Sequence, residues 1–390
     1  SGTVEESWMT RDTIKADLIG WDAIENHRTG TAGDAETSRW LAAEIAAAGA
    51  EPVIDRFPFV RRVPGVCQVS DGTRRAEGLP MFDGGSTPDE GVAGRAGPLG
   101  SDAPIGVAVF GPMGGTPGNR ALAEARRKAR HETIVAISAG DGILPGLAVL
   151  NAEAFRDPYG PPVLQVGTEC RDWLLGAAEH GKDLAVHAEL TEEPTEASNV
   201  QCRIEGRRPE LAPLAVMTPK SAWWTCTAER GGGITLWINM IRHFAANAPE
   251  RTVVFTANTG HELGHVGLDL YLERVPELVA AAHAWIHLGA NFAAPEAPVL
   301  YQAATDPLMA EGLAALNGHG ITDIETTPVG DRPLGEARNI HDGGGTYISL
   351  IGRNRWFHHP DDRWPVSIDL DKLDRINAAF LTLAERLARA

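Results

Sequence analysis

Three stretches in the second half of the chain carry side chains that could bind a metal ion or transfer protons. Glu229 stands before Arg230 and three glycines, His261 and Glu262 are adjacent, and His358 lies in a Phe-His-His-Pro-Asp-Asp segment. Carboxylates and neutral imidazoles are the usual oxygen and nitrogen ligands of zinc, and histidine is also the commonest general acid or base. These residue types predict a metal site or an acid–base site.

Residues 261–265 read His-Glu-Leu-Gly-His, the HExxH pattern that places two histidine ligands one helical turn apart in zinc proteases. That arrangement needs a regular helix, whereas Gly260 directly precedes the pattern and Gly264 weakens a helix within it. A third ligand at a spacing such proteases use is not apparent. We interpret the pattern as a chance match embedded in another site.

From residue 199 onward, segments typical of strands and helices alternate. The predicted strands are 200–204, 211–217, 252–257, 281–288 and 347–351, and the predicted helices are 233–246, 262–272 and 369–388. Such alternation is typical of a mostly parallel sheet covered by helices on both faces. Ligands of these sheets gather at the carboxyl ends of the strands. The segments after residues 217, 257 and 288 and the loop around His358 should therefore share one edge.

The chain before residue 199 predicts two further parts. Helices at 10–27 and 34–48 and a strand at 51–59 should join the later sheet. Residues 79–119 are rich in glycine and proline, with little regular structure apart from a strand at 105–110. Helices at 119–130 and 169–179 and strands at 133–137, 163–166 and 184–190 follow. We expect a three-layer α/β domain formed by residues 1–65 and 193–390, with a smaller α/β domain inserted at 66–192. One large α/β domain is the alternative.

Composition excludes several classes of function. The chain has 390 residues, 43% of them hydrophobic, and a formal net charge of −17, which disfavours nucleic-acid binding. No apolar run reaches the roughly 18 residues that a membrane span needs. Four cysteines without a CxxC pair predict neither a thiolate zinc site nor a disulfide framework. The first residues do not resemble a secretory signal, so we expect a cytoplasmic protein; the oligomeric state is not predicted.

The order of these motifs resembles the zinc aminopeptidase family, which includes bacterial leucyl aminopeptidases, glutamate carboxypeptidases and glutaminyl cyclases. The resemblance runs from about Gly33 to Leu387 and is strongest at residues 251–272 and 358–373. It implies an aminopeptidase-like catalytic domain, and it implies that residues 66–192 are a protease-associated domain.

Position by position, the resemblance is partial. Glu229 matches the family's bridging acid, Glu262 the second acid of a Glu-Glu pair, and His358 the last metal ligand. His261 stands where the family has its general base. The family's first motif, His-x-Asp, is here Thr218-Pro219-Lys220, so that one ligand is missing and a cation replaces a carboxylate.

The resemblance therefore implies one zinc ion held by Glu229, Glu262 and His358. Lys220 would repel a second dication. His261, with an ordinary imidazole pKa of about 6.5, would move the proton. His287 and His265 are less favoured ligands. The residues leave open a site without metal that works through Lys220, Glu229 and His261.

Further side chains could shape a substrate pocket. Trp223 and Trp224 follow a predicted strand and could form an aromatic wall, although core packing is the alternative. Arg338 could bind a carboxylate and His341 could donate to an oxyanion, unless their loop is simply solvated. His283 and His359 are additional imidazoles near the predicted site.

The function predicted from these features is metal-dependent hydrolysis of an amide-type C–N bond in a small molecule or short peptide. Two alternatives stay open. One is a non-hydrolytic cyclase or lyase on the same scaffold, suggested by His261 at the base position. The other is a binding protein whose catalysis has decayed, suggested by the missing His-x-Asp motif.

Overall fold

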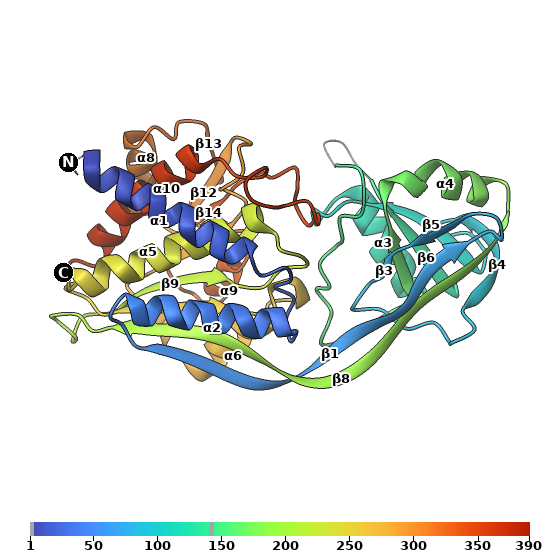
Figure 1. Ribbon diagram of the computed structural model, residues 1–390, viewed down its shortest axis with the longest axis horizontal. Helices are drawn as coiled ribbons and strands as arrows, with labels where there is room; N and C mark the ends of the chain where they lie inside the picture. The colour runs from blue at the N-terminus through green and yellow to red at the C-terminus, as the bar shows by residue number, and fades with distance from the viewer. Residues whose placement is uncertain (1–3, 140–143) are drawn as a thin grey trace.

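The computed structural model describes residues 4–139 and 144–390, and it shows two parts joined by a pair of long strands (Figure 1). The larger part holds both ends of the chain. The strands β1 (Pro52–Ser70) and β8 (Asp183–Ile204) pair antiparallel over most of their length and run through both parts. The predicted domain boundaries lie inside these strands. The separate strands predicted at 184–190 and 200–204 are one, because residues 191–199 also pair with β1.

The sheet of the larger part has the strand order β13-β12-β14-β11-β9-β10-β8. Its central strands β10, β9, β11 and β14 are parallel, and they are apolar runs because helices cover both faces. This confirms the predicted three-layer α/β architecture. The strands are β9 (Leu214–Pro219), β10 (Val253–Asn258), β11 (Ala284–Ala290), β12 (Val299–Ala303), β13 (Ile324–Thr326) and β14 (Tyr347–Ile351).

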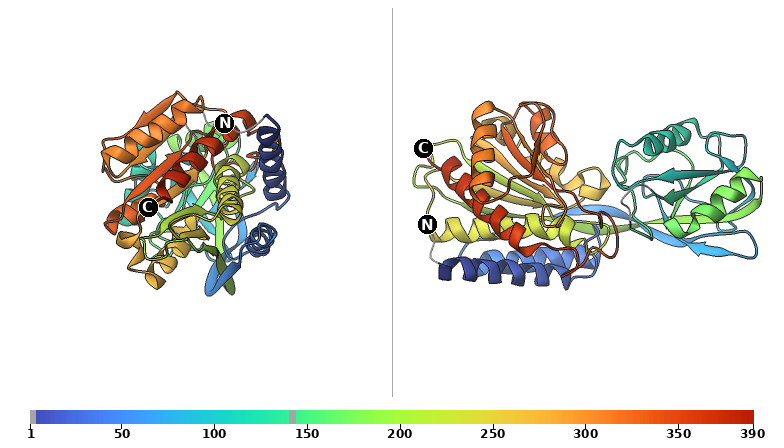
Figure 2. Two further views of the ribbon diagram at one scale, coloured as in Figure 1. Left: turned by 90° about the vertical axis from the view of Figure 1, so that its left-hand side faces the viewer. Right: turned by 90° about the horizontal axis from the view of Figure 1, so that it is seen from above.

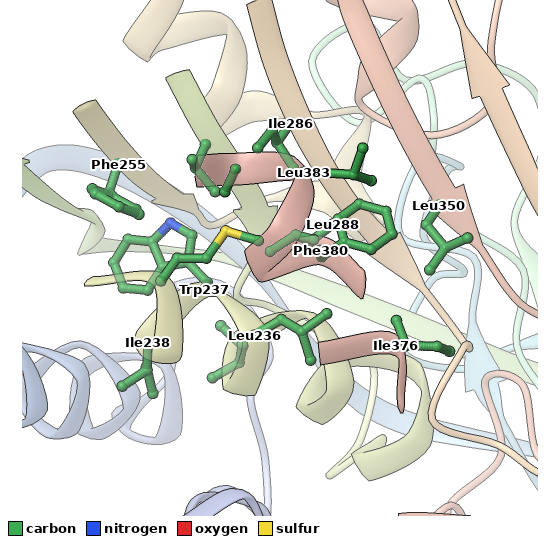
Figure 3. Packing of buried hydrophobic residues seen from close by; sticks show 14 of the residues in the cluster. Leu236, Trp237, Ile238, Phe255, Ile286, Leu288, Leu350, Ile376, Phe380 and Leu383 are labelled. Carbon is green, nitrogen blue, oxygen red and sulfur yellow. The ribbon is translucent and has the colours of Figure 1, made fainter. Parts of the chain in front are cut away.

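Helices flank this sheet, and the views in Figure 2 show them on both of its sides. On one face, α5 and α10 pack against the strands, with Trp237, Ile286 and Phe380 among the fully buried side chains (Figure 3). The helices are α1 (Val4–Asp22), α2 (Ala32–Ala47), α5 (Gly232–Ala246), α6 (Val266–Arg274), α7 (Leu278–Ala281), α8 (Asp306–Gly318), α9 (Ala337–Asp342) and α10 (Leu370–Leu387).

The smaller part has apolar clusters of its own around a short, mostly parallel sheet. Besides β5, the strands β3 and β4 lie in the glycine- and proline-rich stretch, for which the sequence predicted little regular structure beyond the strand at 105–110. The elements are β2 (Arg75–Glu77), β3 (Leu79–Pro80), β4 (Val92–Pro98), β5 (Ile105–Phe110), α3 (Pro117–Lys128), β6 (Thr133–Ser138), β7 (Val163–Val166), η1 (Thr168–Cys170) and α4 (Arg171–Glu179).

Two irregular turns at the carboxyl ends of β9 and β10 position the candidate site. The segment after β9 enters α5 through η2 (Thr227–Gly231), a single π-helical turn, a feature frequent at functional sites. The segment after β10 forms η3 (His261–Leu263), and α6 begins only at Val266. Gly264 and His265 have left-handed backbone angles, with φ of 76° and 64°. The helix predicted at 262–272 is therefore wrong in its first turn, and the HExxH pattern does not lie on a regular helix.

Among the described helices, none combines the length and the hydropathy that crossing a bilayer requires.

Candidate functional site

Glu229 and His358 meet inside the protein, as the sequence predicted for two residues of one site. Nε2 of His358 lies 2.9 Å from Oε1 of Glu229, and both side chains are almost fully buried. Apart from this contact, neither oxygen of Glu229 accepts a hydrogen bond within the described residues. Burial raises the pKa of Glu229, but the charges of Arg230 and His358 outweigh it and hold the pKa below its ordinary value. Glu229 is therefore an ionised carboxylate with free acceptor capacity.

The backbone contact of His358 fixes the proton on one of its ring nitrogens. Nδ1 lies 2.7 Å from the carbonyl oxygen of Val149, which can only accept a hydrogen bond, so Nδ1 carries a proton. The other ring nitrogen, Nε2, therefore faces the carboxylate of Glu229 at 2.9 Å, and the two side chains form a buried histidine–carboxylate pair.

His261 pairs with a carboxyl group from the loop before α9. Its Nδ1 lies 3.3 Å from Oε1 of Glu336, and its ring stacks on His265 with 4.7 Å between centroids. Burial and the charge of Arg230 hold the pKa of His261 well below its ordinary value, so the ring is neutral. Burial raises the pKa of Glu336 to about 8, although Arg230 opposes this. At neutral pH, Glu336 can therefore donate a proton toward a neutral His261.

Both carboxylate oxygens of Glu262 accept hydrogen bonds from neighbouring residues. Oε1 accepts from the backbone N–H of Thr29 at 2.9 Å, and Oε2 accepts from the hydroxyl of Ser221 at 2.6 Å. The same hydroxyl accepts from the N–H of Gly260 and His261. Glu262 therefore fastens the turn after β10 to the neighbouring loops.

Lys220 lies at the end of β9 but is completely buried in an ion pair with Asp34. Thr259 donates to both oxygens of Asp34, and the N–H of Gly30 donates to Oδ2 at 3.1 Å. The predicted catalytic cation is thus engaged by a well-bonded carboxylate at the start of α2.

Asp362 holds the π-helical turn that carries Glu229. Its two oxygens accept from the N–H groups of Ala228 and Glu229, at 2.7 and 3.0 Å. Burial raises the pKa of Asp362 to about 7. The position of the Glu229 backbone thus depends on a carboxyl four residues after His358.

A segment of the smaller part, residues 145–157, contacts the site from across the junction. Besides the Val149 carbonyl on His358, the side chain of Asn151 accepts from Trp223 at 2.9 Å, and Glu153 pairs with Arg338 at 2.9 Å. The N–H of Ala152 donates to the carbonyl of Glu262 at 2.8 Å. This segment is therefore part of the site's immediate surroundings.

The other predicted residues occupy varied positions. Trp223 is buried against Phe82, and Trp224 is half-buried and donates to the carbonyl of His358. Arg338 is partly exposed, and His341 is partly exposed beside Asp342. The two less favoured metal ligands are buried: His265 contacts Asn339 at 2.8 Å, and His287 contacts Ser349 at 2.7 Å.

The donor set does not fit a zinc ion. Tetrahedral zinc with ligands at about 2.1 Å keeps its donor atoms about 3.3 Å apart, whereas Glu229 and His358 are in direct contact and both oxygens of Glu262 have other donors. Among residues 4–139 and 144–390, no three His, Cys, Asp or Glu side chains form a group that could hold a metal. We therefore derive no catalytic step through a metal.

Comparison with solved structures identifies the scaffold. A zinc aminopeptidase from Bacillus subtilis superposes with a TM-score of 0.77 at 14% identity, covering 98% of this chain and 95% of that chain. The fold is that of the zinc aminopeptidases. An aminopeptidase from an Aneurinibacillus strain gives a TM-score of 0.69 at 14% identity over 97% of this chain and 94% of that chain. A glutaminyl cyclase from Fimbriiglobus ruber gives 0.52 at 11% identity over 95% and 93%.

Sequence comparison finds much less. No protein-family model matches the chain. A vacuolar membrane protease of Vanderwaltozyma polyspora is 35% identical over 83 residues, which is 20% of this chain and 8% of that protein. The corresponding protein of Kluyveromyces lactis is 28% identical over 78 residues and is likewise covered over 8% of its length.

The sequence predicted no catalytic or binding role for Arg230, Glu336, Asp362 or Asp34. Asp362 carried a usable signal, because it follows His358 at the spacing of the family's last motif. Arg230 and Glu336 were visible only as neighbours of other candidates. Their importance depends on burial, which local sequence does not reveal.

Proposed function

We propose that this chain is a hydrolase that cleaves an amide-type C–N bond in a small molecule or short peptide. The observation that carries the proposal is the buried, ionised carboxylate of Glu229, which contacts His358 through Oε1, while no described residue hydrogen-bonds to Oε2. It lies at the same sheet edge as the His261–Glu336 pair. Such a site combines a proton acceptor with a proton donor. The aminopeptidase scaffold supports this reaction class.

In the proposed reaction, Glu229 accepts a proton from water while the oxygen of that water attacks the substrate carbonyl. His261 donates the proton on Nε2 to the leaving nitrogen as the C–N bond breaks, and Glu336 supplies a proton to Nδ1. The products are a carboxylic acid and an amine. When the products leave, the proton on Glu229 returns through solvent to Nε2 of His261, and Nδ1 gives its proton back to Glu336.

Substitution within this constellation tests the proposal. Glu229→Gln and His261→Ala should each lower kcat on amide and short-peptide substrates by about 10²- to 10⁴-fold, the usual contribution of a general acid or base. His283→Ala is the matched control, because His283 precedes β11 at the opposite edge of the sheet; the sequence prediction that placed it near the site is wrong. Equal activity of all three variants would refute the assignment.

A second candidate is a non-hydrolytic reaction on the same scaffold. It is favoured by burial, because Glu229, Glu336 and His358 are each at most 1% exposed, an environment that excludes water. Mass spectrometry of the products distinguishes the two, since only hydrolysis adds the mass of water.

A further inference from the structure

Arg230 is a buried cation at the centre of the site. Its side chain is 2% exposed and follows Glu229 in the π-helical turn. Nε donates to the carbonyl of Ser221 at 2.9 Å, and Nη1 donates to the carbonyl of Gly289 at 3.4 Å. These carbonyls belong to the ends of two neighbouring strands, β9 and β11. The guanidinium is therefore fixed across the carboxyl edge of the sheet.

The charge of Arg230 reaches the groups on which the site's chemistry depends. Nε lies 3.7 Å from Oε2 of Glu229. The same charge acts on four other buried titratable side chains around it, which are His261, His265, His287 and Glu336. The carboxyl and imidazole groups of the site thus all lie within the electrostatic reach of one arginine.

We propose that the guanidinium of Arg230 is the permanent cation of this site and takes the place of the zinc ion that the scaffold holds elsewhere. A dication entering beside Glu229 would be repelled by a fixed positive charge in a poorly screened interior. Oε1 of Glu229 and Nε2 of His358 are also in direct contact with each other, at 2.9 Å, which leaves no room for an ion between these two atoms. This proposal concerns the same site as the proposed function, but it does not require that the chain have catalytic activity.

Metal analysis of the purified full chain tests this proposal. After equilibrium dialysis against zinc, elemental analysis should find no stoichiometric zinc in the wild type. Arg230→Met keeps the length of the side chain and removes its charge, so this variant should bind zinc at least about tenfold more tightly. Adding Glu229→Gln should abolish the gain. Arg230→Lys should behave like the wild type, and so should the control Arg242→Met, which removes a cation paired with Asp17.

Two results would overturn the proposal. One is a zinc ion bound stoichiometrically by the wild type and lost in Glu229→Gln. The other is a folded Arg230→Met variant whose zinc affinity equals that of the wild type. If Arg230→Met does not fold, the zinc contents of the wild type and of Glu229→Gln still test the proposal, because it predicts no stoichiometric zinc in either. A chain that follows the expected zinc pattern but cleaves no amide would refute the proposed function and leave this inference standing.

Discussion

Replacing Asp34 by alanine should destabilise the protein by about 3–5 kcal/mol, because it leaves the ammonium of Lys220 buried without a counter-charge. The side chains of this pair are 0% and 2% exposed, so water cannot replace the carboxylate. Asp34→Ala also removes the acceptor of Thr259 and Gly30, which adds to the loss.

Urea unfolding followed by tryptophan fluorescence measures this effect. Asp34→Leu combined with Lys220→Met should be less destabilised than Asp34→Ala by about 2 kcal/mol or more, because the double variant buries no unpaired charge. Arg332→Ala is the control, since its ion pair with Asp342 is half-exposed and should contribute at most about 1 kcal/mol. If Asp34→Ala is as stable as this control, the buried ion pair is not the structural element described above.

Three further predictions concern protons and the segment from the smaller part. Burial raises the pKa of Glu336 to about 8, so activity that needs its proton should fall as pH rises through about 8. The residual activity of Glu336→Gln should not show this fall. A pH profile of Glu336→Gln with the same fall would contradict the role of Glu336 as a proton donor. The pKa of Asp362 is raised from 3.8 to about 7, so the folded state binds this proton more tightly than the unfolded state. The contribution of Asp362 to the free energy of unfolding is complete below pH 3.8 and is lost as pH rises through about 7. The urea midpoints of Asp362→Asn should therefore vary less over this pH range than those of the wild type. Parallel pH dependences of the two midpoints would exclude the raised pKa of Asp362. Arg338→Ala breaks the ion pair with Glu153 and should change KM, whereas the free energy of unfolding should change by at most about 1 kcal/mol. Unchanged steady-state kinetics would show that segment 145–157 does not contribute to substrate binding.

Much of the fold could be predicted from local patterns. The apolar runs at β5, β7 and β14 and the long helix α10 have periodicities that sequence alone reveals. The antiparallel pairing that makes β8 one strand of 22 residues could not be foreseen, because its middle is polar and its partner β1 is more than a hundred residues away.

The candidate site was predicted only in part. Glu229 and His358 could be placed together, since both follow strand ends of one sheet. Glu262 matched the same motif, yet Ser221 and Thr29 occupy its oxygens, and such bonds depend on the three-dimensional arrangement. The partner of Lys220, Asp34, lies 186 positions earlier and has no sequence signal that links the two.

Hydrolysis in ¹⁸O-labelled water by chelator-treated protein shows whether this chain cleaves amide bonds with its own side chains. We expect the carboxylic acid product to gain one labelled oxygen, at a rate that chelation does not change and that Glu229→Gln abolishes. Cleavage that stops on chelation and returns with added zinc, or no cleavage of any amide by the folded protein, would contradict this expectation.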